Sequence, residues 1–344
     1  MNTLRATSFV VPESLNASSP PEIRLGRRDY VKMMMLDRVT GNFINTRFDK
    51  LPDFLQEGDL LVLNNSRTIP AVFHVNVLRN GLVWKKNKEV RLARCIAKNV
   101  WQVLIPDLQL RKEDVLLFSE GLRARVNAVE EPFTVVEFSL CGTQLFNELY
   151  TMVEPVRYEY IHEPWELDYY QTVYATVPGS VEMPSAGRAF SWELLQTLRK
   201  RGIKTAYLQL HTGLSYLLDD RWHQHPSSNK ERYEIPATTL AATKQTKENG
   251  GRVIAVGTTV VRALESVAAL PDSKNHSGWT DLYINDNTAL RTVDGLITGF
   301  HEPEASHLDM LSAFIDREQL ITAYHQAIDS GYLWHEFGDI NLIL

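Results

Sequence analysis

The sequence predicts a mixed α/β (α+β) main domain that carries a small inserted antiparallel β-barrel. Six short runs with β-strand character follow one another between residues 71 and 139, and turn residues such as Asn80-Gly81 separate them. After about residue 151 the pattern changes to alternating strands and helices. The length of 344 residues allows about two domains. We therefore expect a discontinuous main domain, residues 1–66 and 151–344, and an inserted barrel, residues 67–150.

The segment before the barrel should supply two strands of the main domain. Residues 1–22 are rich in Ser, Pro and Asn, which predicts an irregular arm. Met33–Arg38 runs into Thr40-Gly41-Asn42, the pattern of a strand that ends in a turn. Asp59–Leu63 is a short apolar run that predicts a buried strand.

The six runs of the barrel alternate with turns at short intervals. Closure of such strands into a barrel removes exposed sheet edges, which suits an independent insertion. The predicted strands are Ala71–Leu78, Val90–Ile96, Trp101–Ile105, Asp114–Phe118, Leu122–Val126 and Thr134–Ser139.

The segment after the barrel should alternate helices and strands. Ser191 can cap a helix whose leucines at 194, 195 and 198 share one face, and Gly202 provides its stop. The further expected elements are strands at Thr205–Leu210, Val253–Val256 and Ile340–Leu344, and helices at Thr259–Ala268, Leu308–Phe314 and Gln319–Ser330.

Composition places the chain among globular proteins of a reducing compartment. Hydrophobic residues make up 44% and charged residues 23%, which does not favour disorder. Cys95 and Cys141 lie far apart without a CxxC pairing, so no disulfide framework is expected. The N-terminal residues lack the apolar core of a signal peptide, and no apolar run is long enough to span a membrane. We expect a cytoplasmic protein.

The charge distribution leaves RNA binding open. A net charge of −6 argues mildly against a general nucleic-acid binder, but phosphate binding depends on local patches. Arg24–Arg28, Lys85–Arg94 and Arg199–Lys204 are basic runs. Each is either solvated surface or, if two of them share a face, a surface for RNA.

Generic catalytic motifs are absent from the sequence. His223-Gln224-His225 lacks further ligands at zinc-binding spacing, so we expect no metal site. Gly257-Thr258-Thr259 follows a strand and begins a helix, so it either binds a carboxylate or phosphate or simply caps the helix. His211 and His301 adjoin apolar stretches, where a buried, hydrogen-bonded histidine is the common alternative to a catalytic one.

Six segments along the chain form an ordered set of motifs. They are Arg27–Gly41 (RRDYVKMMMLDRVTG), Gly58–Ala71 (GDLLVLNNSRTIPA), Tyr170–Ala175 (YQTVYA), Arg252–Ser266 (RVIAVGTTVVRALES), Leu296–Ser306 (LITGFHEPEAS) and Phe337–Leu344 (FGDINLIL). Together they resemble one protein family, the S-adenosylmethionine:tRNA ribosyltransferase-isomerases of queuosine biosynthesis. The resemblance covers nearly the whole chain and implies a β-barrel inserted in an α/β domain.

The resemblance also implies a reaction and two substrates. Family members transfer the ribosyl part of S-adenosylmethionine to a 7-aminomethyl-7-deazaguanine base in tRNA and isomerise it to epoxyqueuosine, releasing adenine and methionine. Such a reaction needs a base near the sulfonium and an acid near the departing adenine. The expected proton-transfer residues are His211, His301, Asp294 and Glu265. The expected substrate-binding residues are Arg67, Tyr170, Gln171, Tyr174, Ser185, Gly187, Arg188, Glu231, Gly257, Thr258, Thr259 and Arg262.

The chain departs from the family pattern at three motifs. The usual AGLHFT becomes AGRAFS, which replaces a leucine and a histidine by Arg188 and Ala189. A usual histidine falls at about Asn229, and in the C-terminal motif Gly299 and Glu302 replace asparagine and leucine. Two alternatives therefore stay open: a related transferase that uses another acceptor, and a non-catalytic protein that binds S-adenosylmethionine or tRNA. The sequence does not indicate the oligomeric state.

Overall fold

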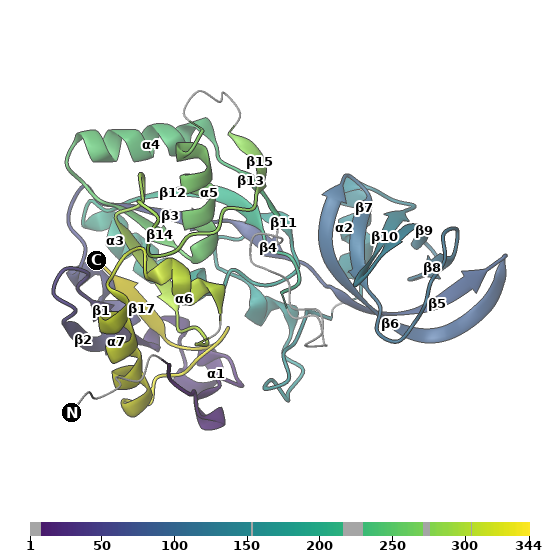
Figure 1. The fold of residues 1–344 in the computed structure, drawn as a ribbon, viewed down its shortest axis with the longest axis horizontal. Helices are drawn as coiled ribbons and strands as arrows, with labels where there is room; N and C mark the ends of the chain where they lie inside the picture. Colours follow the sequence, from purple (N-terminus) through teal and green to yellow (C-terminus); the bar gives the residue numbers. More distant parts are fainter. Residues whose placement is uncertain (1–7, 153, 216–229, 271–275, 304) are drawn as a thin grey trace.

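The computed structural model describes residues 8–152, 154–215, 230–270, 276–303 and 305–344. Its main body is built on a nine-stranded sheet, and a β-barrel projects from one side of this body (Figure 1). In order across the sheet the strands are β15 (Ser277–Thr280), β13 (Glu231–Glu234), β12 (Lys204–His211), β3 (Leu60–Asn64), β14 (Val253–Val256), β16 (Gly295–Gly299), β17 (Ile340–Ile343), β1 (Lys32–Leu36) and β2 (Phe43–Arg47).

The centre of the sheet is parallel, and its edges are antiparallel. Strands β12, β3, β14 and β16 run in the same direction. Strand β17 is antiparallel to β16 and parallel to β1, with Met33 of β1 opposite Ile340 of β17. The last strand of the chain therefore lies inside the sheet rather than at its edge.

Two apolar cores cover the two faces of this sheet. In β3, Leu60 and Val62 face one core and Leu61 and Leu63 face the other, as expected for a strand with both faces buried. The first core packs under α4 (Ala237–Glu248), α5 (Thr258–Ala268), α6 (Ser306–Leu311) and α7 (Arg317–Asp329). The second packs under α3 (Trp192–Lys200) and the 3₁₀ turn Phe48–Asp53. The short α1 (Pro21–Leu25) lies in the N-terminal segment.

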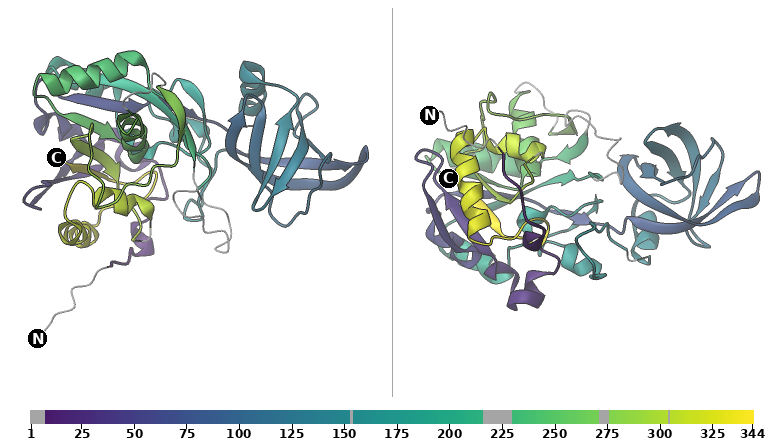
Figure 2. Two further views of the ribbon diagram at one scale, coloured as in Figure 1. Left: turned by 45° about the horizontal axis from the view of Figure 1, so that its top comes forward. Right: turned by 60° about the horizontal axis from the view of Figure 1, so that its bottom comes forward.

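The inserted strands form a closed six-stranded antiparallel barrel, which confirms the predicted fold class. Around the barrel the order is β10 (Phe133–Phe138), β7 (Val100–Leu104), β6 (Leu82–Ala97), β5 (Val72–Arg79), β8 (Val115–Leu117) and β9 (Arg123–Glu130). Helix α2 (Gly142–Tyr150) packs Leu145 and Leu149 into the barrel core. The β5–β6 hairpin turns at Asn80 and Gly81, both with positive φ, and extends beyond the rest of the barrel (Figure 2).

The barrel is joined to the body through neighbouring segments. The backbone N–H of Ala71, where the chain enters the barrel, donates to the carbonyl of Glu154, where it returns, at 2.9 Å. A two-stranded parallel sheet of β4 (Ser66–Thr68) and β11 (Val177–Ser180) lies beside this junction. Within the described residues, none of the helices has the length and apolar content needed to cross a membrane.

Candidate active site

A cavity of about 590 Å³ lies in the body at the carboxyl ends of the parallel strands. Ligands of open α/β sheets bind at this edge, because loops and helix N-termini converge there. Strand β14 leads into Gly257, Thr258 and Thr259 of the lining, and β16 contains Thr298 and leads into His301. We call this space the main cavity. Ser185 and Ala186 of the 3₁₀ turn Ser185–Gly187, with the loop before it, form another wall.

The start of α5 presents backbone N–H groups to the main cavity. Gly257 has φ 95° and ψ 152°, a conformation that is essentially restricted to glycine, and this turns the chain from β14 into the helix. Among the described residues, no side chain accepts a hydrogen bond from the first amides of the helix. Thr259 instead accepts a bond from the Asn64 amide at 3.3 Å. The free amides and the positive helix end can bind an anion.

Aromatic rings line a second wall of the main cavity. Tyr158 stacks on Tyr160 at 5.7 Å between ring centroids, and Tyr160 stacks on His335 at 4.2 Å. The Tyr160 hydroxyl donates to the carboxylate of Glu336. Ring faces carry negative electrostatic potential, so this wall suits a cation.

Burial raises the pKa of three carboxyl groups of the main cavity, those of Glu182, Glu302 and Glu336. Burial raises the pKa of Glu336 to about 7, although the bond from Tyr160 acts in the opposite direction. Burial also raises the pKa of Glu182, whose carboxylate accepts from the backbone N–H and the hydroxyl of Ser215. A carboxyl group with a pKa near 7 is half protonated at neutral pH, which suits a group that transfers protons.

A pair of histidines lies at the end of β16. The His301 Nε2 atom lies 2.8 Å from the Thr298 hydroxyl, and its ring stacks on His307 at 4.8 Å. Burial, followed by the neighbouring His307 and His335, lowers the pKa of His301 well below its usual range. His301 is therefore neutral at physiological pH and can accept or donate a hydrogen bond without carrying charge.

Some of the predicted site residues converge in the main cavity. Tyr170, Ser185 and His301 line it together with the segment Gly257–Thr259. His211 lines a separate hollow, and its Nδ1 atom lies 2.7 Å from the Ser66 hydroxyl. Burial lowers the pKa of His211 to about 4, so its ring is neutral.

Two carboxylates that the sequence predicts to be catalytic accept hydrogen bonds from backbone amides and do not line the main cavity. Glu265 accepts bonds from three consecutive amides, those of residues 291–293, at 2.9–3.0 Å. Asp294 accepts from the Val253 amide and from the Lys247 ammonium group, each at 2.9 Å. Val253 begins β14, so Asp294 lies at the opposite end of that strand from the main cavity. We expect structural roles for both carboxylates.

The remaining predicted binding residues also lie outside the lining. Gln171 pairs with the backbone of Thr68, and Tyr174 is buried with its hydroxyl beside Gly187. Arg67 is exposed over the Tyr150 ring. Glu231 and Arg262 form an ion pair that ties β13 to α5. The sequence predicts these residues from their motifs. A motif does not distinguish a residue that supports the fold from one that lines the main cavity.

The main cavity also contains residues that the sequence analysis did not identify. Glu336, Tyr160, Tyr158 and Glu182 all line it. Glu336 directly precedes the C-terminal motif, but an isolated glutamate carries no spacing signal. Its proximity to Tyr160, 176 positions earlier, arises only in the fold.

Residues 4–343 match the family model described as queuosine biosynthesis protein. The chain belongs to this family. Among solved structures it is similar to the crystal structure of an S-adenosylmethionine tRNA ribosyltransferase from Thermotoga maritima, with a TM-score of 0.56 and 27% sequence identity. That match covers 98% of this chain and 99% of the other. The resemblance predicted from the six sequence segments is thus confirmed at the level of the family.

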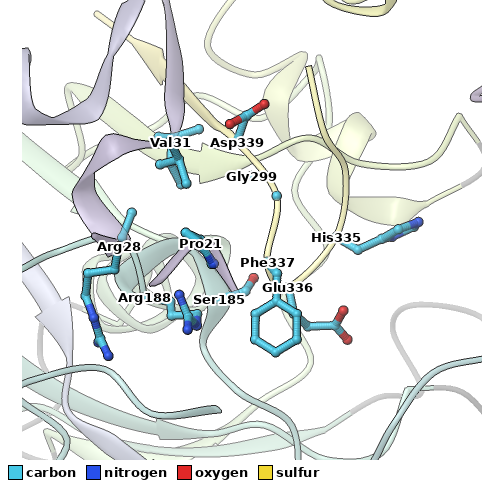
Figure 3. Close-up of a pocket in the computed structure, with 13 residues that line it drawn as sticks. Pro21, Arg28, Val31, Ser185, Arg188, Gly299, His335, Glu336, Phe337 and Asp339 are labelled. Atoms are coloured by element: carbon cyan, nitrogen blue, oxygen red, sulfur yellow. The ribbon is translucent and has the colours of Figure 1, made fainter. Parts of the chain in front are cut away.

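One departure from the queuosine biosynthesis family pattern is buried behind the main cavity. Arg188 is 2% exposed; its Nε donates to the Tyr169 carbonyl and its Nη2 to Glu22, both at 2.7 Å. It lines a small hollow of about 10 Å³, and Figure 3 shows the Glu336 side chain there pointing away from Arg188. That space accommodates about one water molecule. Ala189 is buried in the second core of the sheet.

The two departures at the C-terminal motif of the family, Gly299 and Glu302, line the main cavity itself. His307 lines it as well. The His335 ring lies 3.4 Å from the Glu302 carboxylate. Asn229 and the segment His223–His225 lie outside the described residues. Among the described residues, no group of three or more His, Cys, Asp or Glu is placed to bind a metal ion.

Proposed function

We propose that this protein is an S-adenosylmethionine:tRNA ribosyltransferase-isomerase. It transfers the ribosyl part of S-adenosylmethionine to the 7-aminomethyl-7-deazaguanine base of tRNA and isomerises it to epoxyqueuosine, with release of adenine and methionine. Membership of the queuosine biosynthesis family supports this reaction class. The solved tRNA ribosyltransferase with the same overall architecture supports it as well.

The charge of the main cavity is the observation that carries the proposal. Its described lining residues include Glu182, Glu302 and Glu336 but no lysine or arginine. Aromatic rings, among them Tyr158 and Tyr160, contribute a further wall. A sulfonium is a cation without an N–H donor, so it is stabilised by carboxylates and ring faces rather than by directed hydrogen bonds. The volume of about 590 Å³ is in the range of small-molecule sites.

The start of α5 supplies the complementary anion site. In this proposal the free amides of Thr258 and Thr259 hold the methionine carboxylate of S-adenosylmethionine. The sulfonium then faces the aromatic and carboxylate wall. The helix thus holds the carboxylate of the methionine part, and the rings hold the sulfonium at the centre of the substrate.

Glu336 is the residue we assign to proton transfer. Its pKa of about 7 allows it to remove a proton near the sulfonium at neutral pH and to return one later. Tyr160, which donates to it, orients the carboxylate. The neutral His301 can donate a hydrogen bond to a departing adenine while Thr298 holds its ring.

Adenine release tests the proposal directly. Purified protein is incubated with S-adenosylmethionine and tRNA that carries the precursor base, and adenine is quantified by chromatography. We expect adenine and methionine in equal amounts, with the ribosyl-derived mass appearing on the tRNA. Failure to release adenine with this tRNA and with the alternative acceptors named below, with S-adenosylmethionine binding retained in calorimetry, would support the non-catalytic alternative.

A related transferase that uses a different acceptor is the second candidate function. Two residues that line the main cavity favour testing it. Gly299 and Glu302 replace family residues on the wall where an acceptor would sit. Free 7-aminomethyl-7-deazaguanine and tRNA with guanine at the same position serve as parallel acceptors. Adenine release with the free base, and none with the precursor tRNA, would establish this alternative.

A further inference from the structure

A second hollow lies where the barrel meets the body. Its volume is about 190 Å³, and residues of both parts line it. The barrel contributes Arg94 and Lys98, and the body contributes Arg232, Trp279 and Thr212. We call this space the junction groove. Arg94 connects its two sides, because its Nη1 donates to the Lys230 carbonyl of the body at 2.6 Å.

The junction groove is positively charged. Arg94, Lys98 and Arg232 line it, and its described lining residues include no carboxylate. Within the described part of the chain, neither Lys98 nor Arg232 has a carboxylate within ion-pair distance, although both are exposed. The two other titratable groups are uncharged at neutral pH, because burial lowers the pKa of His211 to about 4 and raises that of Cys95 to about 11.

An aromatic ring lies beside these cations. Trp279 of β15 is directly opposite Arg232 of β13 in the antiparallel pair, so both side chains emerge on the same face of the sheet. The indole is 43% exposed, and the Arg94 guanidinium lies 6.0 Å from its centre. Exposed cations next to an accessible aromatic face match a nucleic-acid strand, which offers phosphates to the cations and bases to the ring.

The junction groove adjoins the main cavity. Thr212, which follows β12, lines both spaces. A strand that occupies the junction groove would therefore lie next to a nucleotide inserted in the main cavity. The charges of the two spaces are opposite: carboxylates line the main cavity, whereas cations line the groove.

We propose that the junction groove binds the phosphate backbone of the acceptor RNA next to the nucleotide that enters the main cavity. Lys98 and Arg232 contact phosphates, and Trp279 stacks on a flanking base. This inference rests on the proposed function for the identity of the RNA. It assigns part of the basic run Lys85–Arg94, through Arg94, to the RNA-binding surface rather than to solvated surface alone.

The salt dependence of RNA binding tests this assignment. Unmodified tRNA transcript is titrated with protein at about 50 and 200 mM salt, because phosphate contacts do not need the precursor base. We expect Arg232→Ala or Lys98→Ala to reduce the slope of log affinity against log salt by about one each, and the double variant by about two. When the salt is raised from about 50 to about 200 mM, the affinity of each single variant should therefore fall by a factor about four times smaller than that of the wild type.

Control variants separate charge from folding. Arg232→Lys keeps the charge and should retain the wild-type slope. Lys244→Ala on α4 removes an exposed cation that lies outside the groove and outside the three basic runs. Trp279→Ala should weaken binding without changing the slope. Circular dichroism and affinity for S-adenosylmethionine should match wild type in every variant.

The outcomes distinguish this inference from the proposed function. Unchanged slopes in both single variants would overturn the RNA assignment of the groove, whatever the activity of the protein. A reduced slope in a protein that releases no adenine would support the groove assignment and contradict the proposed function. Equal slope losses in Arg232→Ala and Lys244→Ala would also overturn the groove assignment, because the effect would then reflect net charge.

Discussion

At the scale of single residues, Glu336 is the group whose removal should affect chemistry most. Glu336→Gln keeps the shape but cannot exchange a proton, so we expect kcat to fall by roughly 100-fold or more with little change in KM for S-adenosylmethionine. In the wild type, kcat should rise as the pH passes through about 7, because the carboxylate becomes ionised above its pKa. Rates of adenine release across pH measure both effects.

Two further variants identify the titrating group. Tyr160→Phe removes a bond that stabilises the Glu336 carboxylate, so the pH profile should move to higher pH. Glu302→Gln changes another carboxyl of the main cavity and should leave the position of the profile unchanged. A wild-type profile that persists in Glu336→Gln would contradict the assignment.

Arg188 and Ala189 lead to a second prediction at this scale. Restoring the family leucine and histidine by Arg188→Leu and Ala189→His should destabilise the protein rather than improve its chemistry. The first change removes one of the two arginines that pair with Glu22 and the donor to the Tyr169 carbonyl, and the second places an imidazole in a packed core. We expect a loss of roughly 1–3 kcal/mol from overpacking alone, measured by urea unfolding. Higher turnover in a variant of unchanged stability would show that these positions act on the reaction.

Only some residues of the main cavity can be predicted from the sequence. His301 and Gly257–Thr259 were identifiable, because each adjoins a strand that ends at the main cavity. Glu336 was not, because its proton affinity depends on burial and on Tyr160, which is remote in sequence. Glu265 resembled a catalytic carboxylate, but the amides it binds belong to a distant segment without a recognisable motif.

At the scale of elements, the turn from β14 into α5 should tolerate little change. Gly257→Ala forces a side chain into a backbone conformation that costs about 1–3 kcal/mol. The added Cβ would lie 3.5 Å from Ala186, an ordinary contact, so backbone strain rather than a clash should dominate. We expect lower unfolding stability and weaker S-adenosylmethionine binding, measured by chemical denaturation and calorimetry.

Gly299→Ala provides the matched control for that variant. Gly299 also lines the main cavity, but its Cβ would meet only the Asp339 carbonyl at 4.0 Å. Its stability should remain close to wild type. If both variants lose the same stability, the conformation of Gly257 is not the cause.

The sequence predicts helices and strands correctly where one or both faces of the element are apolar. The β14 strand and the α3 cap at Ser191 were predicted because burial and capping leave local signals. Helix α4 was missed because its buried side chains include Thr239, Thr243 and Thr246, which do not form an apolar stripe. Strand β6 was predicted to begin at Val90, since its outer half from Leu82 to Lys88 is mostly exposed and does not alternate.

At the scale of the whole molecule, the barrel should be separable from the body. Ala71 and Glu154 are hydrogen-bonded neighbours, so replacing residues 72–153 by a short glycine linker closes the chain without stretching it. We expect the shortened protein to fold and bind S-adenosylmethionine, because the main cavity is lined by the body. Its affinity for tRNA should fall, because Arg94 and Lys98 are removed. Calorimetry and RNA titration measure the two affinities.

This deletion also tests the predicted domain boundaries. Val156, Val181 and Leu214 of the body pack against the barrel core and would become exposed. If the shortened protein aggregates, and polar substitutions at these three positions prevent the aggregation, the result would still support a separable body. Loss of helical and sheet signal in the shortened, substituted protein would contradict the division at residues 67–150.

The position of β17 inside the sheet has a consequence for how the chain folds. The barrel strands span residues 72–138 and can pair as soon as they are synthesised, whereas β1 must wait for a partner 307 positions later, as Met33 pairs with Ile340. At about 5–20 residues per second, this delay lasts roughly 15–60 s on the ribosome. During that time one edge of the apolar β1 strand lacks its neighbour, so nascent chains of this protein should depend on chaperones that shield strand edges.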